Sequence, residues 1–227
     1  MLEDFHAQPA RDRVIVALDC DAATALCLAV QLRGHAKWLK VGMTLYYAEG
    51  PKIVRTFKQL GFNVFLDLKF HDIPHQVEGA AASAVLSGAD MLTMHAVGGS
   101  AMMAAGHRGA GAAAFERKVP VPATLAITVL TSMDAESLAA TGVSRALPEQ
   151  VSALAVQARE AGLSGIVCSP QEASSMRELL GPDAFIVTPG VRPAGSAKGD
   201  QSRVATPAQA FENGASHIVV GRPITQA

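Results

Sequence analysis

The sequence has 227 residues, of which 49% are hydrophobic and 17% are charged, and its formal net charge is −1. This length fits one large domain or two small ones, and the composition can bury a sizeable core, which excludes a disordered chain. The balanced charge, and the lack of a basic tract or of roughly 18 consecutive apolar residues, argue against nucleic acid or a membrane as the main partner.

The chain begins with MLEDFHAQPARDR, which lacks the apolar segment of a secretory signal, so we expect a cytoplasmic protein. Eight short apolar runs then follow one another at intervals of roughly 20–30 residues. The runs are 14–18 (VIVAL), 38–41 (WLKV), 64–68 (VFLDL), 90–94 (DMLTM), 123–129 (ATLAITV), 165–168 (GIVC), 184–187 (AFIV) and 217–220 (HIVV). Their nearly continuous apolar character is typical of strands buried on both faces of a parallel sheet.

Alanine-rich stretches with a helical period separate these runs, for example residues 22–32, 75–86 and 148–161. Repeated strand–helix units of this number predict a (β/α)₈ TIM barrel, an α/β fold. An open, doubly wound sheet has the same local pattern and stays the alternative. No linker divides the chain, so we expect one domain over residues 1–227. Only GRPITQA follows the last run, so we expect the final helix to be missing or truncated.

The third run is unusual because charged residues interrupt it. In FLDLKFHDIPHQV, residues 65–77, the charges are Asp67, Lys69 and Asp72. Asp67 and Lys69 are two apart, so their side chains face the same way on a strand. Lys40, on the neighbouring run, can reach the same barrel mouth. Buried charges add little stability over apolar replacements, so this cluster favours a functional site over an ion-pair network that only sets strand register.

Two later segments point to an anion site. Gly221 and Arg222 follow the eighth run, where barrels frequently bind phosphate, and an arginine offers a two-pronged donor. A long glycine-rich loop, residues 190–207, follows the seventh run and contains Arg192 and Gln201. Loops of this length often act as lids. A surface arginine in a turn remains the plainer interpretation of Arg222.

Neither the cysteines nor the histidines suggest a metal site. Cys20, Cys27 and Cys168 lack the spacing of a zinc site, and the seven histidines are scattered. We therefore expect free, buried thiols, no metal and no cofactor.

Taken together, these residues resemble the orotidine 5′-phosphate decarboxylase family over nearly the whole chain. The pattern D-x-K-x-x-D-I-P stands at residues 67–74, LKVG lies upstream at 39–42, and TPGVRP, GDQ and VVGRPI lie downstream. The resemblance implies a cofactor-free homodimer that converts orotidine 5′-monophosphate to UMP and CO₂, the last step of de novo pyrimidine synthesis.

The resemblance also implies a role for each matching residue. Lys69 would donate a proton to C6 of the pyrimidine, and Asp67 would lie next to the departing carboxylate. Lys40 and Asp72 would complete a Lys-Asp-Lys-Asp array, in which Asp72 acts across the dimer interface. The residues implied for substrate binding are Asp19 and Lys40 at the ribose, Thr131 at the pyrimidine, Gln201, Gly221, Arg222 and Arg192 at the phosphate, and Ile73 and Gln76.

Two departures and three alternatives stand beside this resemblance, and the missing or truncated final helix noted above is one of the departures. The family usually has Asn-Thr after the D-I-P sequence, and that threonine helps bind ribose, whereas this chain has His75 and Gln76. The alternative is the Mg²⁺-dependent sugar-phosphate decarboxylase and synthase group, which has the same barrel and a similar Asp-x-Lys-x-x-Asp pattern. A phosphate-ligand binder without activity, and a barrel whose charges only pair, are the non-enzymatic alternatives.

Overall fold

The computed structural model describes residues 4–193 and 205–227. Eight parallel strands pair in chain order, and the last pairs back to the first, so the sheet closes into a barrel. The strands are β1 (Val14–Ala17), β2 (Trp38–Gly42), β3 (Asn63–Phe70), β4 (Met91–His95), β5 (Ala123–Ile127), β6 (Gly165–Val167), β7 (Phe185–Thr188) and β8 (His217–Val220). The closed barrel confirms the predicted fold, and the open doubly wound sheet is wrong.

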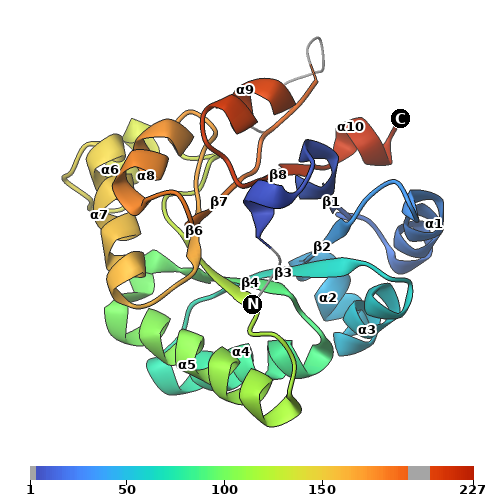
Figure 1. The fold of residues 1–227 in the computed structure, drawn as a ribbon. Coiled ribbons are helices and arrows are strands. Elements are labelled where there is room, and N and C mark those ends of the chain that lie inside the picture. Colours follow the sequence, from blue (N-terminus) through green and yellow to red (C-terminus); the bar gives the residue numbers. More distant parts are fainter. Residues whose placement is uncertain (1–3, 194–204) are drawn as a thin grey trace.

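Helices form an outer ring around the strands, as Figure 1 shows. They are α1 (Ala22–Leu32), α2 (Met43–Glu49), α3 (Pro51–Gln59), α4 (Pro74–Ser87), α5 (Ser100–Arg117), α6 (Ala135–Ala140), α7 (Leu147–Glu160), α8 (Ala173–Leu180), α9 (Pro207–Glu212) and α10 (Arg222–Thr225), with 3₁₀ turns η1 (Phe5–Ala7), η2 (Ala10–Arg13) and η3 (Ala96–Gly98). The final helix, expected to be missing or truncated, is present as α10 with four residues.

Local sequence explains where several helices begin and end. The Asp21 carboxylate accepts the N–H of Thr24, which caps α1, and Pro74 occupies the first turn of α4, where no hydrogen-bond donor is needed. Gly88 ends α4 in the left-handed conformation with φ of 102°. None of the helices in the described ranges combines the length and apolarity needed to cross a membrane.

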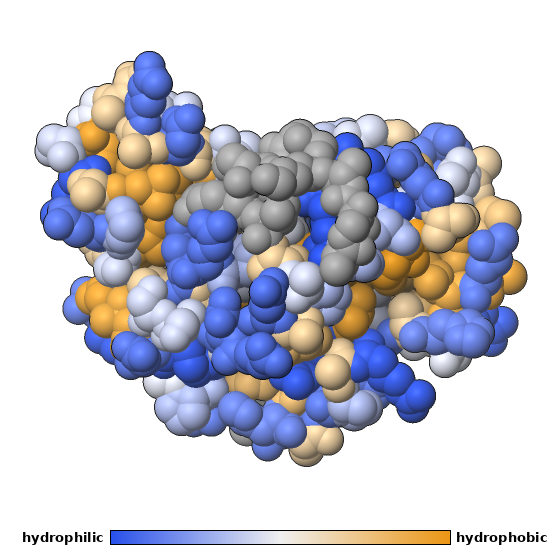
Figure 2. Space-filling view, turned by 90° about the horizontal axis from the view of Figure 1, so that it is seen from above, coloured by the Kyte–Doolittle hydropathy of each residue, from blue (hydrophilic) through white to orange (hydrophobic). Residues whose placement is uncertain are grey.

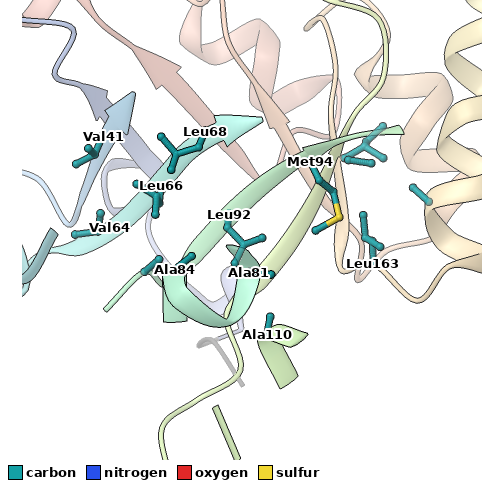
Figure 3. Close-up of a cluster of buried hydrophobic side chains, with 14 of the residues drawn as sticks. Val41, Val64, Leu66, Leu68, Ala81, Ala84, Leu92, Met94, Ala110 and Leu163 are labelled. Carbon is teal, nitrogen blue, oxygen red and sulfur yellow. The ribbon is translucent and has the colours of Figure 1, made fainter. Parts of the chain in front are cut away.

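Two apolar layers hold the barrel together. Inward side chains such as Ile15, Phe65 and Val187 fill the barrel, while outward side chains of the same strands pack under the helices. Figure 3 shows the outer layer between β2, β3 and β4 and helices α4 and α5, where Leu66 and Leu92 lie against the helix that carries Ala81 and Ala84. Hydrophilic residues occupy most of the face in Figure 2, with small hydrophobic groups among them.

An aromatic cluster fills the end of the barrel at which the strands begin. The His217 ring stacks on Phe185 and meets Trp38 edge-on, with centroid distances of 5.7 Å and 5.5 Å. Phe5, from η1, packs edge-on against Phe185. With this end filled by rings, the cavity described below lies at the opposite end, where the strands finish.

Candidate active site

A cavity of about 630 Å³ opens at the carboxyl ends of the strands. In (β/α)₈ barrels this is the end that carries active sites. Its floor is apolar and includes Ala17, Phe65, Ile127, Val167 and Val219. Eight of the residues predicted from sequence line it, namely Asp19, Lys40, Asp67, Lys69, Thr131, Arg192, Gly221 and Arg222. Residues more than 200 positions apart in the chain therefore share one site.

The charged residues form a chain of alternating sign along one wall of the cavity. The Lys40 Nζ lies 2.9 Å from Asp19 Oδ1 and 3.6 Å from Asp67 Oδ2. The Lys69 Nζ lies 2.9 Å from the same Asp67 oxygen. Lys40 and Asp67 are nearly buried, with exposed fractions of 9% and 8%. One carboxylate oxygen thus faces two ammonium groups, which is an arrangement that holds both lysines in place.

Mutual attraction decides the charge state of the buried pair. Burial by itself would lower the pKa of Lys40, but the carboxylates of Asp67 and Asp19 raise it above its ordinary value. Burial would likewise raise the pKa of Asp67, but the ammonium groups of Lys40 and Lys69, with hydrogen bonds from Lys69 and Thr93, bring it below its ordinary value. Near neutral pH the carboxylate of Asp67 is therefore ionised and Lys40 is protonated.

The backbone of β3 is irregular where it carries these charges. Its pairing with β4 shifts between Leu66 and Phe70, and Lys69 has φ of 53°, in the left-handed region. That conformation costs a residue other than glycine of order 1–3 kcal/mol and is concentrated at functional sites. Alternation along a regular strand predicted that Asp67 and Lys69 project together, which is confirmed, but the irregularity between them was not predicted.

Thr93, on β4, contacts both charged residues of β3 and was missed by the sequence analysis. Its hydroxyl donates to Asp67 Oδ1 at 2.9 Å and accepts the backbone N–H of Lys69 at 3.0 Å. A signal was present, because Thr93 is a polar residue within the apolar run MLTMH and is separated by one residue from His95 on the same face of the strand.

Three of the predicted residues lie away from the cavity of their own chain. Asp72, Ile73 and Gln76 are exposed and are not among the described residues that line the cavity. The Asp72 Oδ1 accepts the N–H of Ile73 at 2.6 Å, which fixes the start of the turn into α4. The array of four charges is therefore represented within one chain by Lys40, Asp67 and Lys69.

The anion-binding residues predicted near β7 and β8 are only partly described. Arg222 begins α10 one residue after the end of β8, and Arg192 follows β7, so two arginines from neighbouring strand ends line the cavity. The predicted lid loop is paired at its base, because the N–H of Arg192 donates to the carbonyl of Ala205 at 3.0 Å. Gln201 and the rest of that loop, 194–204, lie outside the described residues.

One of the three free cysteines lines the cavity. All three cysteines are free, as expected, but only Cys168 is buried. Cys27 is exposed on α1, and Cys20 is partly exposed and lines the cavity, so the expectation of buried thiols is wrong for both. Helix α1 turns Cys27 outward, beside Gln31, away from the core. Within residues 4–193 and 205–227, no three His, Cys, Asp or Glu side chains group closely enough to hold a metal ion.

Comparison with known proteins identifies the family that this chain matches. Residues 12–227 match the family described as Orotidine 5′-phosphate decarboxylase / HUMPS family. The chain belongs to this family. The sequence resemblance is thereby confirmed over nearly the whole chain, and it includes every strand of the barrel.

Individual members of the family are similar to this chain along most of their length. The orotidine 5′-phosphate decarboxylase of Moorella thermoacetica is 49% identical over 100% of this chain and 90% of its own. That of Anaeromyxobacter sp. (strain K) is 51% identical over 95% of this chain and 92% of its own. The crystal structure of the Lactobacillus acidophilus decarboxylase superposes with a TM-score of 0.83 at 38% identity, covering 95% of this chain and 92% of that one. These relatives carry the name of the decarboxylase and not that of the Mg²⁺-dependent sugar-phosphate enzymes.

Proposed function

We propose that this protein, as one barrel domain in the cytoplasm, decarboxylates orotidine 5′-monophosphate to UMP and CO₂ without a cofactor, as the last step of de novo pyrimidine synthesis. The observation that carries the proposal is the charge chain Asp19–Lys40–Asp67–Lys69, held at 2.9–3.6 Å in a cavity that two arginines also line. Membership of the family, and relatives of that name along the whole barrel, support it.

Lys69 is assigned as the proton donor. When the bond between C6 and the carboxylate breaks, CO₂ leaves and an electron pair remains at C6, with no adjacent π-system to absorb it. A preorganised ammonium stabilises that charge and then transfers its proton to C6, which yields UMP. The position of Lys69 supports this role, because Lys69 lines the cavity and Asp67 Oδ2, 2.9 Å from its Nζ, restrains the ammonium group.

Asp67 is assigned to the place beside the substrate carboxylate. Repulsion of that carboxylate and restraint of Lys69 are both compatible with an ionised Asp67. The geometry supports restraint, since Asp67 Oδ2 contacts both lysines and Oδ1 is bonded to Thr93. A fixed charge of this kind needs no reorganisation during the reaction, which is the main source of electrostatic catalysis.

The remaining cavity residues are assigned to substrate binding. The paired Asp19 and Lys40 suit ribose hydroxyls, since together they offer an acceptor and a donor 2.9 Å apart. The apolar floor suits the face of a pyrimidine, with Thr131 at its edge. Arg192, Gln201, Gly221 and Arg222 are assigned to the phosphate, whose binding energy would help organise the reacting end of the substrate.

A homodimer is part of this proposal, with Asp72, Ile73 and Gln76 reaching the site of the partner. Exposed apolar residues on the segments that follow β2, β3 and β4 support an interface at this side of the barrel. Tyr47 is 76% exposed, Ile73 is 63% exposed, and Met43 and Val97 are also exposed. Apolar groups of this kind, rimmed by polar residues, mark interaction sites. Asp72 stands among them on the segment after β3.

The direct test is the fall in ultraviolet absorbance as purified protein consumes orotidine 5′-monophosphate. We expect turnover that persists when EDTA is added, because the proposed chemistry uses an ammonium group and not a metal ion. Turnover that EDTA abolishes and Mg²⁺ restores would contradict the metal-free mechanism. No consumption of the substrate would contradict the proposed function.

A further inference from the structure

The pairing between β3 and β4 is interrupted at the catalytic charges. Leu66 pairs with Leu92 and Phe70 pairs with Met94, so three residues of β3 stand opposite the single residue Thr93 of β4. A bulge of this kind leaves backbone groups without their ladder partners. One of them, the N–H of Lys69, belongs to the residue that has the left-handed backbone.

The Thr93 hydroxyl supplies the missing partner. It accepts the Lys69 N–H at 3.0 Å and donates to Asp67 Oδ1 at 2.9 Å, and Thr93 is fully buried, with an exposed fraction of 0%. A hydroxyl has one proton to give, and an ionised carboxylate can only accept. The direction of the two bonds is therefore determined: the Lys69 N–H donates to Thr93, and Thr93 donates to Asp67.

The two oxygens of the Asp67 carboxylate have different partners. Oδ1 is occupied by Thr93, and Oδ2 faces the Nζ atoms of Lys69 and Lys40 at 2.9 Å and 3.6 Å. The carboxylate cannot rotate freely without losing one set of partners. Thr93 thus acts on both ends of the Asp67–Lys69 pair, on the backbone of one residue and on the side chain of the other.

We propose that Thr93 is a positioning residue, whose hydroxyl holds the Lys69 ammonium and the Asp67 carboxylate in their reactive geometry. This inference rests on the proposed function, because it concerns how the assigned proton donor is aimed. Thr93 is not among the residues that line the cavity, so its effect passes through Asp67 and Lys69.

The test compares three changes at Thr93 with one matched control. Thr93→Val keeps the shape and removes the hydroxyl, Thr93→Ala removes it without any risk of a clash, and Thr93→Ser restores it. The control is Thr124→Val on β5. Thr124 is also fully buried, and its hydroxyl is bonded to His107 Nδ1 at 2.9 Å, outside the catalytic machinery.

We expect Thr93→Val and Thr93→Ala to lower kcat by roughly 10- to 100-fold, the usual effect of releasing a positioned catalytic group. KM and the affinity for UMP, measured by calorimetry, should stay close to those of the unaltered protein, and Thr93→Ser should recover most of kcat. The acid limb of the kcat–pH profile should move to higher pH in Thr93→Val, because ionised Asp67 loses a hydrogen bond. Thr124→Val should keep kcat.

The outcomes separate this inference from the proposed function. If the unaltered protein does not convert orotidine 5′-monophosphate, the proposed function fails. If it does, and Thr93→Val is equally fast, only the positioning role fails. Loss of UMP binding in both hydroxyl-free variants, or a fall of kcat in Thr124→Val as large as in Thr93→Val, would assign Thr93 to the stability of the barrel and overturn the inference.

Discussion

Lys69 combines an unfavourable backbone conformation with a charged side chain that its surroundings hold in place. Its φ of 53° is compensated by the bond from its N–H to Thr93 and by the ion pair with Asp67. Strain of this kind persists only where neighbouring contacts determine the geometry. The position of the Lys69 side chain therefore depends on three strands of the barrel, β2, β3 and β4.

Replacing Lys69 by alanine tests the role of the ammonium group. We expect Lys69→Ala to abolish turnover, because no other cation in the proposed mechanism donates a proton to C6, while circular dichroism and thermal unfolding show a folded protein. Lys52→Ala is the matched control, since Lys52 is an exposed lysine on α3. Substantial residual turnover in Lys69→Ala would refute the assignment of the proton donor.

Helices α4 and α5 pack closely against each other behind β3 and β4. A side chain at Gly109 of α5 would place its Cβ 2.2 Å from the backbone oxygen of Glu78 in α4. The backbone of α4 cannot yield as a flexible side chain would. Because α4 follows directly on the segment that carries Asp72, this close contact also restrains the helix that begins at the end of that segment.

Two glycine substitutions on α5 should have opposite effects. Gly109→Ala should destabilise the protein by about 1–3 kcal/mol, the usual cost of overpacking. Gly111→Ala, on the same helix, meets nothing within 4 Å and should stabilise it by about 0.5–1 kcal/mol through the better helix propensity of alanine. Urea unfolding measures both. Equal effects of the two changes would show that the helices can separate without cost.

The stability of the whole molecule should depend on pH through the aromatic end of the barrel. Burial lowers the pKa of His217 to about 3, with smaller contributions from Arg13 and Lys37. In the unfolded chain the ordinary value is 6.5. The neutral ring therefore stabilises the fold fully above pH 6.5, and that stability is lost as the pH falls from 6.5 toward 3.

Between pH 7 and pH 5 the titration of His217 should cost about 2 kcal/mol of unfolding free energy. His217→Phe keeps an aromatic ring against Phe185 and Trp38 and removes the titration, so its stability should fall less over this range. The measurement is urea unfolding of both proteins at the two pH values. If the two proteins lose the same stability, the pH dependence comes from other groups.

The proposed homodimer can be tested by mixing two inactive variants. Lys69→Ala and Asp72→Asn should each be inactive alone, but mixing them should restore turnover. Random exchange should give about a quarter of the unaltered activity, because half of the dimers are mixed and one of the two sites in each has both native residues. No recovery, with subunit exchange shown by mass spectrometry, would contradict the assignment of Asp72 to the partner's site.

The eight strands, their order along the chain and three of the helices could be predicted from the sequence. Residues 217–220 and 22–32 match β8 and α1 at both ends, and the other strands differ from the predicted runs by one or two residues at one or both ends. Asp67, Lys69, Lys40 and Arg222 could be selected because the signals that mark them are local: alternation along a strand, charges in an apolar run, and an arginine after the last strand.

How these segments meet depends on contacts that form only in the folded chain. Closure of the barrel depends on pairing between β1 and β8, which are separated by nearly the whole chain, and local patterns are the same in an open sheet. The bulge opposite Thr93 and the left-handed Lys69 arise from the register between two strands. Each depends on contacts between distant residues, and the spacing of residues along one segment carries no record of them.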